Sequence, residues 1–130
     1  MNIEQKQHRI LIAEDNNFVR MQIVKYLQDD GYETDDYATA AEAVPASKNK
    51  YDAAIVDVRM EPMGGFEFIK SMRSDKIDTP TILVTGDENP DLLSEAARLE
   101  VSAVLIKPVQ KDRLLKAVEK TIQKAERRAE

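Results

Sequence analysis

Short apolar runs alternate along the chain with segments of helical period, and this alternation restricts the possible folds more than any other feature. Each run is short enough to be a strand that is buried on both faces of a sheet. These runs are residues 10–13, 53–56, 82–84 and 104–106. A fifth segment, residues 33–38, is polar but contains the β-favouring Thr34 and Tyr37, which indicates an edge strand.

Between these runs, apolar residues recur at helical spacing. Val19, Ile23 and Leu27 share one face of a helix that Gly31 ends, and Asn89 with Pro90 is a typical helix start. The other apolar stripes are Phe66–Ile69–Met72, Leu93–Ala96–Ala97 and Leu115–Val118–Ile122–Ala125. Pro45 predicts a short or kinked helix within residues 39–49.

Five strand–helix units of this size predict an α/β fold. The expected architecture is a flavodoxin-like, doubly wound sheet of five parallel strands in the order 2-1-3-4-5, with five helices. The 130 residues correspond to one domain. We expect a polar N-terminal lead over residues 1–8, the domain over 9–126, and a C-terminal tail or the start of a linker over 127–130.

Composition excludes several classes of protein. The chain has no cysteine, and its one histidine, His8, lies in the polar lead, which argues against a disulfide scaffold, a thiolate nucleophile and a histidine-based metal site. The formal net charge of −5 disfavours binding to nucleic-acid phosphates. Neither a membrane-spanning run nor a secretory signal is present, so we expect a cytoplasmic protein without membrane contact.

Charge is unevenly distributed along the chain. From Lys107 to the end, eight basic residues stand against four acidic ones, which gives this segment +4 and leaves −9 for the rest. One interpretation is the solvated face of a terminal helix, because basic side chains suit the last turns of a helix. The other interpretation is a docking face for an acidic partner.

Polar residues follow four of the predicted strands. Glu14 and Asp15 follow the first strand, Asp57 ends the third, Thr85 ends the fourth and Lys107 follows the fifth. Ligands of such folds bind at the carboxyl edge of the strands. We therefore expect these five side chains to gather at one edge of the sheet.

Three clustered carboxylates repel one another unless positive charge joins them. Lys107 supplies one charge, and a divalent cation would supply the rest; ligands that are all oxygens favour Mg²⁺. Asp57 is then a candidate nucleophile for phosphoryl transfer, with Thr85 and Lys107 able to hold phosphoryl oxygens. Each residue alone also has an ordinary explanation, such as acidic residues at a helix N-terminus, so the prediction depends on the joint pattern.

Five motifs mark the strand ends and the turns beside them. They are I-L-I-A-E-D-N at 10–16, I-V-D-V-R-M at 55–60, M-G-G-F-E at 63–67, L-V-T-G at 83–86 and L-I-K-P at 105–108. In this order the motifs resemble the receiver domain of bacterial two-component response regulators. The resemblance covers residues 9–126.

This resemblance implies that Asp57 accepts a phosphoryl group from a sensor histidine kinase or a histidine phosphotransfer protein. It implies Mg²⁺ bound directly by Asp15 and Asp57, with the backbone carbonyl of Arg59, and largely through water by Glu14. Phosphorylation and the slow hydrolysis that follows would both be self-catalysed, so the chain would be a signalling switch and not an enzyme with a separate substrate.

Two further residues acquire roles through the resemblance. Thr85 would move to the phosphoryl group on activation, and Lys107 would pair with that group ahead of a cis bond to Pro108. The switch would reshape the face around the fourth helix and fifth strand for an unknown downstream protein target. We expect no DNA binding by this chain, and a monomer or a phosphorylation-dependent dimer.

The sequence departs from the family pattern at several positions. Pro commonly stands at the position of Glu61 and here follows as Pro62, while Gly64 replaces a usual Asp. Val104 stands where the family commonly has Tyr or Phe, and valine is small with few rotamers. The aromatic part of the switch is therefore absent at Val104.

Arg59 and Asp87 each lie two residues beyond a site residue, Asp57 and Thr85 respectively. We expect them to form an ion pair over the mouth of the site, where it would slow the entry of the hydrolytic water. The alternative is two independently solvated side chains.

Three other functions fit parts of the pattern. A flavodoxin-type nucleotide binder is disfavoured because Glu14 and Asp15 would repel phosphate. A haloacid-dehalogenase-like phosphatase would need an acid where Arg59 stands. A phosphorylation-independent, receiver-like interaction module is the main alternative, supported by Val104. The sequence leaves open whether the chain is a stand-alone receiver or part of a larger regulator or hybrid kinase.

Overall fold

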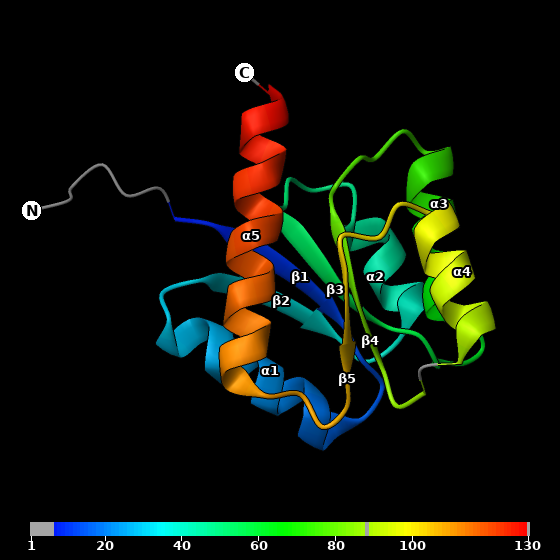
Figure 1. Ribbon diagram of the computed structural model, residues 1–130, viewed down its shortest axis with the longest axis horizontal. Helices are drawn as coiled ribbons and strands as arrows, with labels where there is room; N and C mark the ends of the chain where they lie inside the picture. The colour runs from blue at the N-terminus through cyan, green and yellow to red at the C-terminus, as the bar shows by residue number, and fades with distance from the viewer. Residues whose placement is uncertain (1–6, 88, 130) are drawn as a thin grey trace, which may run out of the picture.

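The computed structural model describes residues 7–87 and 89–129. Strands and helices alternate strictly along the chain. They are β1 (Arg9–Ala13), α1 (Asn17–Asp29), β2 (Glu33–Tyr37), α2 (Ala40–Ala46), β3 (Ala53–Asp57), α3 (Gly65–Ser74), β4 (Thr81–Thr85), α4 (Pro90–Arg98), β5 (Ala103–Ile106) and α5 (Lys111–Ala129). The strands form one parallel sheet in the order β2-β1-β3-β4-β5, so the predicted fold class is confirmed (Figure 1).

Helices cover both faces of the sheet (Figure 1). Side chains alternate between the two faces along each strand, so each strand contributes to both halves of the core. In β1, Ile10 and Ile12 pack with α1 and α5, whereas Leu11 and Ala13 belong to the cluster that includes α2, α3 and α4. Every residue of β3 and β4 is buried, as expected for central strands.

The two outer strands differ from the central ones. The polar β2 is an edge strand, as predicted. The prediction that residues 104–106 are buried on both faces is wrong, because β5 is the other edge of the sheet. Ala103, Val104 and Leu105 are half-buried, and Ile106 is 38% exposed.

Local signals explain where the helices begin and end. The side chains of Asn16 and Asn89 accept hydrogen bonds from Val19 N–H and Leu92 N–H, which caps α1 and α4. Gly31 adopts a left-handed conformation (φ 93°) just beyond α1. The helix α2, which contains Pro45, has only seven residues, as the proline predicted.

Two predicted helical stripes begin at the wrong leucine, although Ala96 in α4 and Val118 and Ile122 in α5 are buried as predicted. In α4, Leu92 is buried and Leu93 is 45% exposed; in α5, Leu114 is buried and Leu115 only half-buried. The Asn89 cap sets the rotation of α4, and a pair of adjacent leucines does not by itself indicate which of the two faces the core. Ala125 is likewise only half-buried.

The predicted ends of the chain lie partly outside the described residues. His8 is described, and its Nε2 lies 3.1 Å from Glu126 Oε2 of α5. The helix α5 continues to Ala129, so the described part of the predicted tail is helical. Among the described helices, none combines the length and apolar character that crossing a lipid bilayer requires.

Candidate functional site

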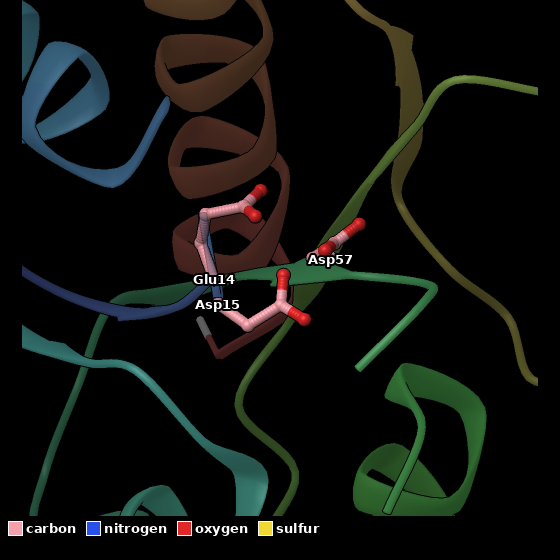
Figure 2. Close-up of side chains that lie close together, drawn as sticks. All are labelled: Glu14, Asp15 and Asp57. Carbon is pink, nitrogen blue, oxygen red and sulfur yellow. The ribbon is translucent and has the colours of Figure 1, made fainter. Parts of the chain in front are cut away.

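The ends of four strands bring the predicted polar residues to one edge of the sheet. Glu14 and Asp15 follow β1, Asp57 ends β3, Thr85 ends β4 and Lys107 follows β5. Glu14 and Asp57 are almost completely buried, at 1% and 3% exposure, while Asp15 is exposed. One carboxylate oxygen from each of the three acidic residues lies within 4.8 Å of the others (Figure 2).

Lys107 joins two of these carboxylates. Its Nζ lies 3.2 Å from Glu14 Oε1 and 3.3 Å from Asp57 Oδ1. The bond between Lys107 and Pro108 is cis, as predicted. One ammonium group thus forms ion pairs with two buried carboxylates, and Asp15 places a third carboxylate beside them.

The pKa values of the site reflect this imbalance of charge. Burial, reinforced by the nearby Glu14 carboxylate, raises the pKa of Asp57 from 3.8 to about 7, although Lys107 opposes the shift. Burial alone would lower the pKa of Lys107, but the charges of Asp57 and Glu14 outweigh it and raise that pKa. The site therefore holds more buried negative charge than one lysine offsets.

The donor set fits a hard divalent cation. Glu14 Oε1 is buried and accepts no hydrogen bond from the described residues, although the Lys107 ammonium is close to it. Every clustered donor atom is a carboxylate oxygen, and Mg²⁺ prefers oxygen ligands. Arg59 lies next to this group, because its N–H donates to Asp57 Oδ1 at 3.4 Å. The role of the Arg59 carbonyl as a ligand stays a prediction.

Two residues outside the predicted site hold Glu14 in place. The N–H of Asn16 donates to Glu14 Oε2 at 3.0 Å, and the Arg20 guanidinium donates to the Glu14 carbonyl oxygen at 2.8 Å. Arg20 also pairs with Asp36 of β2 at 3.1 Å. Sequence reasoning missed Arg20, and its position one turn into α1 was the only signal available.

Gly65 allows α3 to begin directly against Asp57. A Cβ atom added at Gly65 would overlap the carbonyl oxygen of Asp57, so no larger side chain fits without a shift of the backbone. The N–H of Gly65 donates to Val58 O at 2.9 Å, which closes the loop after β3. Within that loop the bond between Glu61 and Pro62 is cis. The sequence marked Gly64 and Gly65 as a helix start but did not reveal this close approach.

Thr85 is turned toward the loop that follows β4. Its hydroxyl donates to Asp87 O at 3.0 Å and accepts from Asp87 N–H at 3.1 Å. The predicted Arg59–Asp87 ion pair is present, with 3.0 Å between Arg59 Nη2 and Asp87 Oδ2. The effect of this pair on water entry stays a prediction.

Val104 lies in β5, next to β4. It is half-buried and packs against the core cluster on the α2–α3–α4 side of the sheet. A ring flip at this position is impossible, because the residue is valine.

The chain matches known proteins over most of its length. Residues 10–119 match the family model of the response regulator receiver domain. The chain is 30% identical to the chemotaxis protein CheY of Bacillus subtilis over 117 residues, which cover 88% of this chain and 98% of that protein. It is 33% identical to the transcriptional regulatory protein PdtaR of Mycobacterium tuberculosis over 113 residues, 85% of this chain but 55% of PdtaR.

Solved structures agree with the sequence matches. The structure of the Vibrio cholerae chemotaxis protein CheY4 superposes with a TM-score of 0.83 at 31% identity, covering 89% of this chain and 99% of that one. The fold and the strand-end cluster are those of a signalling domain of the receiver type. The chain belongs to the response regulator receiver domain family. The chain spans about half the length of PdtaR.

Proposed function

We propose that the chain is a phosphorylation-dependent signalling switch in which Asp57 accepts the phosphoryl group. The observation that carries this proposal is the cluster of Asp57 with Glu14, Asp15 and Lys107 at the carboxyl edge of the sheet. The donor is a phosphohistidine of a sensor histidine kinase or of a histidine phosphotransfer protein. An oxygen of Asp57 attacks phosphorus, the P–N bond breaks, and the released imidazole takes up a proton.

Mg²⁺ is part of this proposal. Asp15, Asp57 and the Arg59 carbonyl would hold the ion directly, and Glu14 largely through water. When bound, Mg²⁺ supplies positive charge that offsets the charge of the carboxylates and of the incoming phosphoryl oxygens. The buried Glu14 oxygen without a hydrogen bond and the all-oxygen donor set support this assignment.

Lys107 and Thr85 then hold the phosphoryl group on Asp57. The Lys107 ammonium already lies at hydrogen-bond range of the Asp57 carboxylate, so it needs little movement to reach a phosphoryl oxygen. Thr85 must exchange its hydrogen bond to the Asp87 carbonyl for one to the phosphoryl group. That exchange links the chemistry at Asp57 to the loop between β4 and α4, and so to the protein contacts of the face around α4 and β5.

The Arg59–Asp87 ion pair is proposed to restrict water entry to the phosphorylated site. The two side chains come from the loops after β3 and β4, and their contact joins the two loops beyond Asp57 and Thr85. An exposed pair contributes about 0–1 kcal/mol, so its effect falls on access and not on fold stability. Slow self-catalysed hydrolysis then resets the switch.

A phosphorylation-independent interaction module is the second candidate, and Val104 is the observation that favours it. In either case the partner is a protein, an unknown downstream target, and the chain does not bind DNA. The chain itself is a monomer or a phosphorylation-dependent dimer. The two candidates differ in one property, which is the covalent modification of Asp57.

Intact-mass measurement with acetyl phosphate separates the two candidates. Wild type, Asp57→Ala and the control Asp75→Ala, an exposed residue at the end of α3, are incubated with the donor with and without Mg²⁺. A gain of one phosphoryl group in wild type and the control, dependent on Mg²⁺ and absent in Asp57→Ala, supports the switch. If acetyl phosphate and a phosphohistidine donor both fail to modify wild type, the interaction module is the better assignment.

A further inference from the structure

The turn after β1 carries two of the three clustered carboxylates, so its main chain decides where both of them lie. Glu14 and Asp15 are consecutive residues of this turn, and Asp57 of β3 is the third member of the cluster (Figure 2). Asp15 is exposed, so packing around its side chain does little to hold it. The position of the Asp15 carboxylate therefore depends on the main chain of the turn.

The guanidinium of Arg20 ties this turn to α1 and to the edge strand β2. Its Nη1 donates to the Glu14 carbonyl oxygen at 2.8 Å, its Nε donates to Asp36 Oδ2 at 3.1 Å, and its Nη2 donates to Asn17 Oδ1. The three nitrogens thus bond three acceptors on three segments of the chain. The Arg20 side chain is only 13% exposed. A planar fork of donors can make these contacts together, whereas the single nitrogen of a lysine cannot.

Two main-chain donors hold the same turn. Glu14 N–H donates to Tyr37 O at 3.1 Å, and Asn16 N–H donates to Glu14 Oε2 at 3.0 Å. The carbonyl that Arg20 bonds belongs to the planar peptide group that joins Glu14 to Asp15. The contact with Arg20 therefore fixes the orientation of the peptide group from which Asp15 extends.

We propose that Arg20 is a positioning residue for the divalent cation site, because it holds the peptide group between Glu14 and Asp15 so that both carboxylates face Asp57. The inference rests on the Mg²⁺ site of the proposed function and adds the residue that orients that site. Groups that orient metal ligands without touching the metal commonly account for about 10- to 100-fold in metal affinity.

The sign of the effect separates positioning from charge. Arg20 places a positive charge beside the acidic turn, and positive charge disfavours the binding of a cation. If Arg20 acted through its charge alone, its removal would tighten Mg²⁺ binding. A positioning role predicts the opposite change. Arg20→Lys keeps the charge but loses the fork of donors, so a positioning role predicts weaker binding in this variant too.

Titration of the full, unphosphorylated chain with MgCl₂, followed by the NMR amide signals, tests the proposal. We expect the Kd for Mg²⁺ to rise about tenfold or more in Arg20→Ala and at least about threefold in Arg20→Lys. The matched control is Arg9→Ala, which breaks a 3.0 Å ion pair with Asp35 of β2 at the amino end of β1, far along the strand from the acidic turn. The control should change the Kd less than about twofold.

A second readout separates positioning from a purely structural role. The partners of Arg20 are Glu14 O, Asn17 and Asp36, and none of these is a reacting group. With acetyl phosphate, the rate at saturating Mg²⁺ should therefore stay within about twofold of wild type, while the Mg²⁺ concentration that gives half of this rate rises with the Kd. Urea unfolding in EDTA verifies that each variant is folded, and Arg20→Lys decides the matter if Arg20→Ala does not fold.

Three results would overturn the proposal. An unchanged or lower Kd in the Arg20 variants, or equal weakening in Arg20→Ala and Arg9→Ala, would remove the positioning role while the Mg²⁺ site of the wild type stands. Failure of the wild type itself to bind Mg²⁺ would overturn the proposed cation site together with the role of Arg20.

Discussion

The Nζ atom of Lys107 lies 3.3 Å from Oδ1 of Asp57, although β4 separates their strands in the sheet. The lysine side chain thus spans one strand to reach a carboxylate at the centre of the carboxyl edge. The same ammonium lies 3.2 Å from Glu14, so it is shared between two buried carboxylates. One ammonium group therefore leaves an excess of negative charge among the carboxylates of Glu14, Asp15 and Asp57.

Asp57→Asn is expected to stabilise the protein in the absence of divalent cations. Folding raises the pKa of the Asp57 carboxyl group from 3.8 to about 7. The ionised group therefore destabilises the folded state once the pH exceeds 3.8, and this loss of stability is complete above about pH 7. The variant should therefore gain about 1–3 kcal/mol in the free energy of unfolding at pH 8, and nothing at pH 3. Urea unfolding in EDTA across this range measures the gain. Asp75→Asn is the exposed control, and a pH-independent difference would contradict the assigned cause.

Mg²⁺ is expected to stabilise the folded chain through the same carboxylates. An ion that binds only the folded state raises the unfolding free energy by about 2.7 kcal/mol at a hundredfold excess over its Kd. Asp15→Asn should remove most of this gain, while leaving the stability in EDTA within about 0.5 kcal/mol because Asp15 is exposed. Thermal melts with and without MgCl₂ measure both quantities. An undiminished shift in Asp15→Asn would remove Asp15 from the ligand set.

Gly65→Ala is expected to destabilise the chain by about 2–4 kcal/mol, because the new methyl group overlaps the carbonyl of Asp57 at the start of α3. Gly86→Ala is the matched control, since nothing lies within 4 Å of a Cβ atom there. Equilibrium unfolding of the two variants measures the difference. Equal stability of the two variants would show that the start of α3 moves freely away from Asp57.

Arg59→Ala is expected to accelerate loss of the phosphoryl group. Removing the ion pair with Asp87 opens the rim of the site, and a change of about 0.5–1 kcal/mol in the barrier corresponds to about two- to fivefold in rate. Lys70→Ala serves as the control, because it breaks a comparable ion pair with Glu95 that joins α3 to α4. The decay of phosphorylated protein, followed by intact mass, measures the rate. An unchanged rate in Arg59→Ala would exclude a gating role.

The sequence predicted those parts of the structure that depend on local pattern. Runs such as residues 53–56 have the length and apolar character of central strands, and parallel strands bring the residues that follow them to one edge. This is why Asp57 and Lys107 could be placed together although 50 residues separate them in the sequence.

Features that depend on packing between distant segments were not predictable. The choice of Leu92 over Leu93 depends on the rotation that the Asn89 cap gives to α4. The exposure of Ile106 is the exception, because the predicted order 2-1-3-4-5 already placed the fifth strand at an edge of the sheet. The clash at Gly65 depends on how closely α3 approaches the main chain of Asp57, which no spacing in the sequence encodes.

Chemical identification of the phosphorylated residue tests the central claim most directly. The chain is incubated with Mg²⁺ and a phosphohistidine donor, or with acetyl phosphate, and treated with borohydride, which reduces an acyl phosphate to the corresponding alcohol. Peptide mass mapping then locates the reduced side chain. Phosphorylation of the proposed acceptor predicts homoserine at position 57 and at no other acidic position. Reduction at another carboxylate, or no reduction after treatment with both donors, would contradict the claim.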